Sequence, residues 1–172
     1  MSRELEVDGL RFLFPAGWNA LKYDDSVFHR NQFQSFAGGS KALDAVAISP
    51  DSVLWLIEVK DYRHNPRSKV SSVFSEVAAK VKSTLAGLAT ARVRANDKAE
   101  NDFAKQAMST KGLRVVLHLD QPQHNSRLFK QVVDPRTATR YLRDKVRAVD
   151  PHAICCGCGV TAAKLPWTIE TT

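Results

Sequence analysis

The sequence lacks several features that would place it in particular protein classes. It has no apolar run near the roughly 20 residues that cross a bilayer. Its first residues, Met-Ser-Arg-Glu-Leu-Glu-Val-Asp, carry acids and no apolar core, so they do not form a secretory signal. Internal repeats, low-complexity tracts and a clear linker are also missing. We therefore expect a cytosolic protein, and its 172 residues predict a single domain over 1–172.

Cysteine is scarce, and its three copies sit together as Cys155, Cys156 and Cys158. An odd, tightly clustered set does not form a disulfide framework and agrees with a reducing compartment. His152 lies just upstream, which leaves a soft-metal site as one interpretation. Zinc sites usually draw ligands from two separated pairs, and the sequence has no second pair. We therefore favour a buried strand or turn of small residues over 153–160.

Charge of both signs is plentiful, with an excess of positive charge. The net charge is +7 and the pI is near 9.5. Hydrophobic residues make up 44% of the chain and charged residues 25%, a composition typical of a globular protein. The positive excess favours an acidic partner, of which nucleic acid is the commonest.

The apolar pattern changes period along the chain and predicts an α/β fold, a mixed central sheet flanked by helices. An Asp8-Gly9 turn indicates an N-terminal β-hairpin over 5–14. Three- and four-residue spacing from Val70 to Leu88 predicts a long amphipathic helix. Asp134-Pro135 opens a basic helix to about Val149. Further strands are expected over 18–23, 42–48, 53–60, 113–119 and near 153, a second helix over 98–108, and 27–36 is a short helix or a loop.

The most informative residues are Asp44, Glu58 and Lys60. Side chains alternate along a strand, so Glu58 and Lys60 project from one face of the apolar strand 53–60. The turn at 49–52 makes the strand before it an antiparallel neighbour, which brings Asp44 near them. Two converging carboxylates suit a hard divalent cation such as Mg²⁺, and a lysine can orient water or stabilise charge on phosphate. The alternative is an ordinary ion pair at a strand end.

The segment Lys41-Ala-Leu-Asp44, followed after the turn by Glu58-Val59-Lys60-Asp61-Tyr62-Arg63, resembles the core of the PD-(D/E)XK, or restriction-endonuclease-like, nuclease superfamily. The resemblance covers about residues 41–120. It implies metal binding by Asp44, Glu58 and the Val59 carbonyl, with Mg²⁺ or Mn²⁺ as the cofactor and Lys60 as the catalytic lysine.

Two departures from that pattern stand out. Leu43 replaces the usual proline, and no clear helix carries an acid before the hairpin. Asp24 and Asp25 are the best substitutes for that acid, and an ordinary turn is the alternative interpretation of both.

Basic residues around the motif are candidates for nucleic-acid contacts. Lys41 precedes Asp44, and Arg63, Arg67 and Lys69 follow Lys60. They could grip a phosphate backbone, or they could lie in a solvated loop. The charges of the long helix could extend this basic track, although helix charges usually lie on the solvent-exposed face, where we expect them. They are Lys80, Lys82, Arg92 and Arg94.

The sequence therefore predicts a Mg²⁺-dependent nuclease that acts on nucleic acid, with DNA expected, as a possible homodimer. The alternative is a catalytically inactive nuclease-like module that binds nucleic acid or a protein partner. A third hypothesis is a structural subunit in which Asp44, Glu58 and Lys60 form only an ion pair.

Overall fold

The computed structural model describes residues 3–63, 72–122, 131–157 and 165–171. Its helices are α1 (Val73–Arg94), α2 (Lys98–Ala107) and α3 (Pro135–Val146), with two short turns, η1 (His29–Phe33) and η2 (Phe36–Gly38). The strands are β1 (Arg3–Val7), β2 (Leu10–Phe14), β3 (Asn19–Lys22), β4 (Ala45–Ile48), β5 (Val53–Asp61), β6 (Gly112–Asp120), β7 (Ile154–Cys156) and β8 (Thr168–Thr171).

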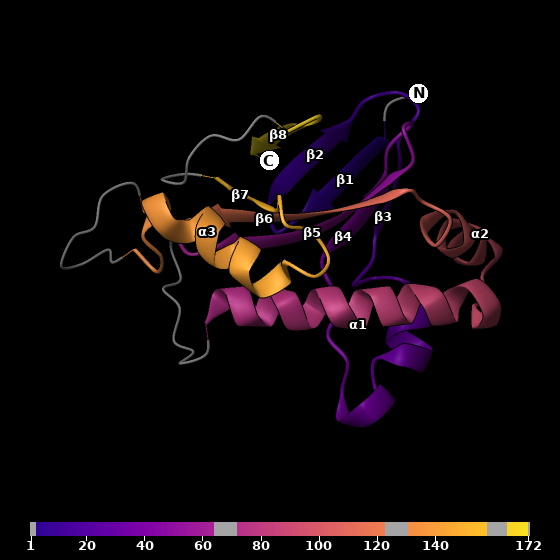
Figure 1. Cartoon of the computed structure of the whole chain (residues 1–172). Helices are drawn as coiled ribbons and strands as arrows, with labels where there is room; N and C mark the ends of the chain where they lie inside the picture. Colours follow the sequence, from indigo (N-terminus) through magenta and orange to yellow (C-terminus); the bar gives the residue numbers. More distant parts are fainter. Residues whose placement is uncertain (1–2, 64–71, 123–130, 158–164, 172) are drawn as a thin grey trace.

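These strands form two sheets. The larger sheet has five strands in the order β3-β4-β5-β6-β7, antiparallel from β3 to β5 and parallel from β5 to β7. The smaller sheet is antiparallel, in the order β1-β2-β8. Figure 1 shows the larger sheet between the smaller sheet on one side and α1 and α3 on the other. The predicted fold class is thus confirmed: a mixed sheet flanked by helices, with an N-terminal hairpin.

Strand β5 is the centre of the larger sheet, and its two faces serve two cores. Leu54 and Leu56 are buried in the core between the sheet and the helices. Ile57 and Val59 point the other way, into the core shared with the smaller sheet. Because successive side chains alternate, Glu58 takes the same face as Leu54 and Leu56, which is the face that α1 covers. The expected double burial of this strand is confirmed.

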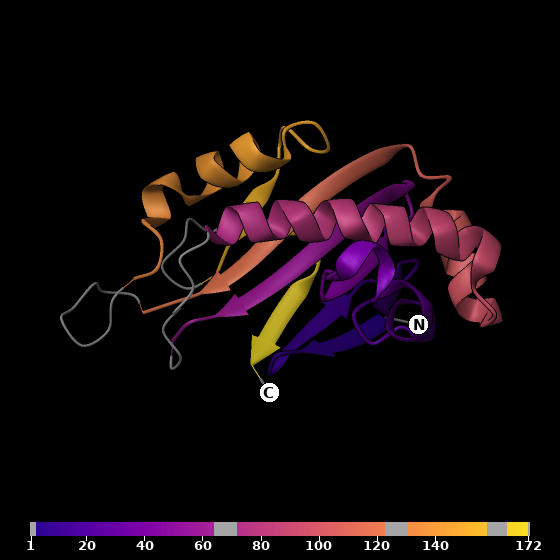
Figure 2. The ribbon, with the colours of Figure 1, turned by 90° about the horizontal axis from the view of Figure 1, so that it is seen from below.

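Helix α1 lies across that face of the sheet (Figure 2). Its buried residues recur at three- and four-residue spacing, as an amphipathic helix requires; they are Val73, Phe74, Val77, Val81, Thr84, Gly87, Leu88 and Ala91. Gly87 is needed for close packing, because a Cβ there would stand 2.2 Å from the Tyr23 hydroxyl. The helix begins three residues later than the apolar pattern suggested.

Two local expectations differ from the structure. Asp44 lies just before β4 rather than within a strand that begins at residue 42. Helix α3 ends at Val146, short of Val149. By contrast, the stretch 27–36, expected as a short helix or a loop, does contain a short helix, the π-helical η1, and the start of η2. In the described part of the chain, no helix is both long and apolar enough to cross a membrane.

Candidate functional site

Four charged side chains meet where β5 passes under α1, and we call them the acid–lysine cluster: Asp44, Glu58, Lys60 and Lys80. Asp44 precedes β4, Glu58 and Lys60 come from β5, and Lys80 comes from α1. The antiparallel register pairs Ala45 with Ile57, which places Asp44 next to the second half of β5. The predicted convergence of Asp44, Glu58 and Lys60 therefore occurs.

Hydrogen bonds and ion pairs tie the cluster together. The Lys80 Nζ lies 2.6 Å from Glu58 Oε1 and 3.3 Å from Asp44 Oδ1. The Lys60 Nζ lies 2.5 Å from the same Glu58 oxygen. Asp44 Oδ2 accepts a hydrogen bond of 2.7 Å from the backbone N–H of Val59. Two ammonium groups thus share one carboxylate oxygen, and Asp44 braces the strand that carries it.

Glu58 is the most unusual member of the cluster. Its side chain is fully buried, and its Oε2 has no hydrogen-bond partner among the described residues. Burial, helped by the negative charge of Asp44, raises the pKa of Glu58 from 4.5 to about 7, against the opposing pull of Lys80 and Lys60. Lys80 and Lys60 therefore hold a carboxyl group that titrates near neutral pH.

Lys60, the lysine of the motif, also has a raised pKa. Burial by itself lowers the pKa of Lys60, but the neighbouring Glu58 carboxylate outweighs it and the net shift is upward. Lys60 therefore stays protonated at neutral pH and does not act as a general base in this arrangement. It holds a positive charge beside Glu58.

Two cavities flank the cluster. One, of about 470 Å³, is lined by Asp24, His29, Arg30, Lys41, Asp44 and Lys80 among others. The other, of about 520 Å³, is lined by Lys41, Lys60, Glu76, Lys80 and Ser83 among others. Burial raises the pKa of Asp24, and the negative charge of Asp44 raises it further. Asp24 also lines the first cavity together with Asp44 and Lys80, so this acid lies close to the cluster. Asp25 instead pairs with Lys22 at 3.0 Å.

The four residues predicted to contact nucleic acid differ in their surroundings. Lys41 is exposed and lines both cavities. Arg63 is held by Asp61 through Nε at 3.0 Å and a second nitrogen at 2.8 Å. Arg67 and Lys69 lie outside the described residues.

Sequence reasoning missed Lys80 as a member of the cluster. It was expected on the wet face of the long helix, and that expectation is wrong, because its amino group points into the cluster. The available signal was spacing. Lys80 follows Val73 by seven residues and precedes Thr84 by four, which places it on the buried stripe of α1.

The predicted divalent-cation site at Asp44, Glu58 and Val59 fits these residues only in part. Among the described residues, no group of three or more His, Cys, Asp or Glu side chains is arranged to hold a metal ion. Glu58 Oε2 offers one unpartnered ligand oxygen, but Lys80 contacts both carboxylates. The structure gives the metal site no support, and binding of Mg²⁺ or Mn²⁺ stays a prediction.

The two described cysteines of the cluster lie in a buried strand. Cys155 and Cys156 lie in β7, and Cys158 lies outside the described residues. The Cys156 Sγ is 3.8 Å from His118 Nδ1 on the neighbouring β6. Burial raises the pKa of both described thiols to about 12, so neither is a ready nucleophile or metal ligand.

A second charged surface lies on α3. Arg136, Arg140, Arg143 and Arg147 recur at four-, three- and four-residue spacing, so they share one helical face, and all four are exposed. We call them the arginine row. The opposite side of α3 buries Ala138, Leu142 and Val146. The row borders a cavity of about 470 Å³.

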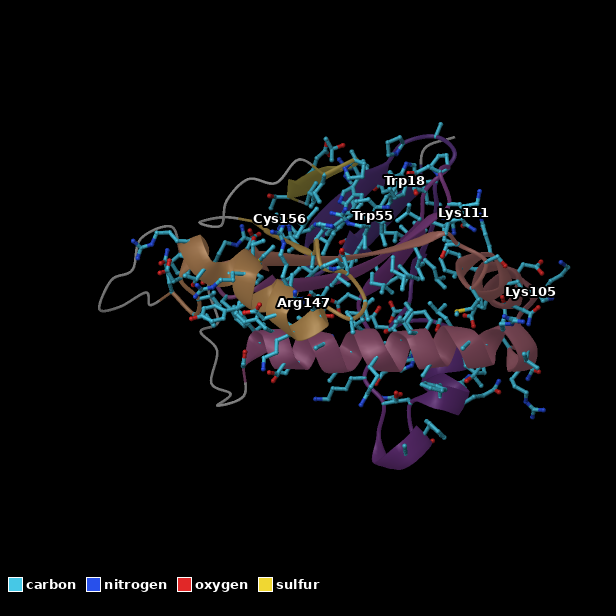
Figure 3. All side chains as sticks on the ribbon, viewed as in Figure 1. Trp18, Trp55, Lys105, Lys111, Arg147 and Cys156 are labelled. Carbon is cyan, nitrogen blue, oxygen red and sulfur yellow. The ribbon has the colours of Figure 1, made fainter. Side chains whose placement is uncertain are left out.

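Two members of the row have partners within the chain. Arg136 pairs with Asp134 at 3.1 Å, and Arg143 Nε donates to the Ala153 carbonyl at 3.0 Å. The Arg140 guanidinium lies 5.2 Å from the centre of the Tyr141 ring, and Arg147 follows the last turn of α3 (Figure 3). These contacts leave Arg140 and Arg147 without a carboxylate partner among the described residues, so their charge is directed outward.

Comparisons with known proteins give one relative to consider. The chain is 29% identical over 168 residues to the cysteine–tRNA ligase of Neisseria meningitidis serogroup A, strain Z2491. The match covers 80% of this chain and 24% of the relative, so the chain spans about a quarter of the ligase. No family model matches the chain, and no solved structure matches it.

This likeness corrects the functional prediction made from the motif. The relative is named as a cysteine–tRNA ligase and not as a nuclease, so the comparison contradicts the prediction of a nuclease that hydrolyses phosphodiesters. The physical reason for the error lies in the motif itself. Acid and lysine at strand ends suit phosphodiester cleavage, but they also form a closed ion-pair network, as Glu58, Lys60 and Lys80 do here.

Proposed function

We propose that this chain is an RNA-binding domain whose ligand is tRNA, and that the arginine row of α3 is its principal contact surface. The observation that carries the proposal is the placement of four exposed arginines on one helical face. The likeness to a tRNA ligase supports the choice of ligand. The net charge of +7 supports an anionic partner.

The geometry of the row suits a phosphate backbone. From Arg136 to Arg147 the helix rises about 16 Å, so the guanidinium groups are spread along a line rather than gathered at a point. Guanidinium groups bind phosphate oxygens through paired, charge-assisted hydrogen bonds. Double-stranded RNA is recognised mainly through its shape, phosphates and 2′-hydroxyls, which fits a helix that presents cations and few base-reading side chains.

The proposal covers RNA binding and leaves aminoacylation aside, because the match spans 24% of the ligase. RNA replaces the DNA expected from the motif, since the relative's name specifies tRNA. A cytosolic location is part of this proposal.

The scaffold relationship to the PD-(D/E)XK superfamily is a separate proposal. It is supported by the β4–β5 hairpin, which presents Asp44, Glu58 and Lys60 to one place, followed by α1 and the parallel strand β6. We propose this kinship for the scaffold alone. The acid–lysine cluster then has a structural role, in which it anchors α1 to the sheet.

A salt titration of tRNA binding tests the RNA-binding proposal. We expect the logarithm of the association constant to fall linearly with the logarithm of salt concentration. Replacing Arg140 and Arg147 with Gln should reduce that slope by about 2, because each lost phosphate contact removes about 1. Fluorescence anisotropy with labelled tRNA measures both the affinity and the slope.

The matched control replaces Lys105 and Lys111 with Gln. These lysines lie at the α2 end of the molecule, away from Arg147 (Figure 3), and the pair removes the same net charge. The control should shift the slope far less than the arginine pair. Equal slopes for the two double variants would show that α3 is not the contact surface, and no binding of tRNA by the unaltered protein would refute the proposal.

A further inference from the structure

Three phenylalanine rings form a stack that begins in the core and ends at the surface. The Phe28 and Phe33 rings are stacked, with centres 6.1 Å apart and planes at 30°. The Phe33 and Phe36 rings are also stacked, at 5.3 Å and 29°. Phe28 and Phe33 are buried, whereas Phe36 is 60% exposed. The last ring of the stack is thus open on the side that Phe33 does not cover.

The backbone beyond Phe36 is shaped to keep this ring at the tip of a loop. Ala37, Gly38 and Gly39 all have positive φ, of 53°, 81° and 120°. For Ala37 that conformation is unfavourable, so the surrounding loop must enforce it. The N–H of Ser40 closes the loop by donating to the Gln34 carbonyl at 2.7 Å. In Figure 2 this segment lies on the opposite side of α1 from α3.

Charges of both signs lie beside the segment that carries the open ring. Arg30 in η1 and Lys41 at the end of the loop are exposed, and both line one cavity together with Asp24, Asp25 and Asp44. Asp25 is paired with Lys22 at 3.0 Å and lies 4.0 Å from Arg30, and Asp44 lies 3.3 Å from Lys80. A ligand at this loop would therefore meet an exposed aromatic ring with an exposed cation before it and another after it in the sequence.

We propose that Phe36 is a stacking platform for an unpaired nucleobase of RNA, with Lys41 and Arg30 contacting the adjoining phosphates. A nucleobase is flat and aromatic, so it extends the Phe28–Phe33–Phe36 stack by one ring. Proteins that bind single-stranded RNA combine these two features, an aromatic face for the base and cations for the backbone. The proposal rests on the proposed RNA-binding function and adds a second contact, specific for unpaired nucleotides.

The charge around the loop favours this occupant over an apolar protein segment. A hydrophobic docking site would need a continuous apolar surface. Here Val27 is the other large hydrophobic residue exposed in this part of the described chain, and Arg30 and Gln34 lie between it and Phe36 in the sequence. A single exposed ring, with exposed cations on the same segment, suits a base better than a peptide.

Two RNA probes separate this contact from the arginine row: a single-stranded RNA of about 12 nucleotides and a blunt duplex of the same length. We expect Phe36→Ala to weaken binding of the single strand about tenfold, the loss of one base–aromatic stack, and to leave duplex binding unchanged. Phe36→Leu should weaken it similarly, because leucine keeps the apolar volume but not the flat ring. Phe36→Trp should preserve or tighten binding.

The matched control is Val27→Ala, which trims an exposed apolar side chain of the same segment. It should leave single-strand binding unchanged. Single-strand binding that is the same in Phe36→Ala and the unaltered protein would overturn the platform, while duplex binding that depends on Arg140 and Arg147 would leave the proposed function intact. If Phe36→Leu binds the single strand as well as the unaltered protein, apolar contact rather than stacking explains the site, and the proposal fails.

Discussion

Glu58 makes the stability of this protein depend on pH in a direction that can be worked out. The unfolded chain releases the Glu58 proton near pH 4.5, whereas the folded protein holds it until about pH 7. Between these values the folded state binds more protons than the unfolded state. Raising the pH through this window therefore favours unfolding, and the contribution of Glu58 to stability is full below pH 4.5 and lost above pH 7.

The size of the effect follows from the shift in pKa. A rise from 4.5 to about 7 corresponds to about 3 kcal/mol between the fully protonated and fully ionised carboxyl. That is a large fraction of the 5–15 kcal/mol that usually separates folded from unfolded states. The physical cause is the desolvation of a fully buried carboxylate, which Lys60 and Lys80 offset only in part.

The assay is urea unfolding of the unaltered protein and of Glu58→Gln at a series of pH values. Glutamine does not titrate, so the free energy of unfolding of the unaltered protein should fall by about 3 kcal/mol relative to the variant from acidic to weakly alkaline pH. Taking the difference between the two proteins removes the titration of groups other than Glu58 that both share. A difference that is constant with pH, or that rises with pH, would refute the reasoning.

Two further predictions concern the packing of α1, and both are measured as free energies of unfolding in urea. Gly87→Ala should destabilise the fold by about 1–3 kcal/mol, although alanine favours helix, because the new Cβ would stand 2.2 Å from the buried Tyr23 hydroxyl; an increase in stability would contradict the packing described. Thr84→Val should cost about 1–3 kcal/mol, because it removes the acceptor of the Leu43 N–H, 3.0 Å away in the core. Thr84→Ser keeps that acceptor and should retain the hydrogen bond, so equal losses in the two variants would disprove its contribution.

Local rules were enough to predict the hairpin that carries Asp44, Glu58 and Lys60. Side chains alternate along a strand with a period of two, and the tight turn at 49–52 determines which strands become neighbours. The same rules predicted α1, because its buried residues keep the period of a helix. What they could not provide was the partner of the acids, since the rotation of α1 that brings Lys80 to Glu58 depends on packing across the sheet.

The loop that holds the phenylalanine stack shows why other parts resisted prediction. Glu100 of α2 accepts hydrogen bonds from the backbone N–H groups of Val27 and Phe28, at 2.6 and 2.9 Å, from 72 or more residues away in the sequence. No local pattern signals a carboxylate that arrives from so far along the chain. For the arginine row, the sequence shows the spacing of the four residues. The structure adds which side of α3 is buried, and the row lies on the other side.

The smaller sheet has a consequence for how this chain can be connected to others. β1 and β8 flank the same strand, β2, and run parallel to each other, with Arg3 opposite Phe14 and Thr171 opposite Leu10. The two described ends of the chain therefore lie in one sheet but at its opposite ends, about 17 Å apart by strand geometry. A short peptide could join them, and a circularly permuted protein opened elsewhere should keep the same sheet order. Equally, a longer polypeptide would enter this unit at one end of the smaller sheet and leave it at the other, so a host protein that accepts the unit must span that distance.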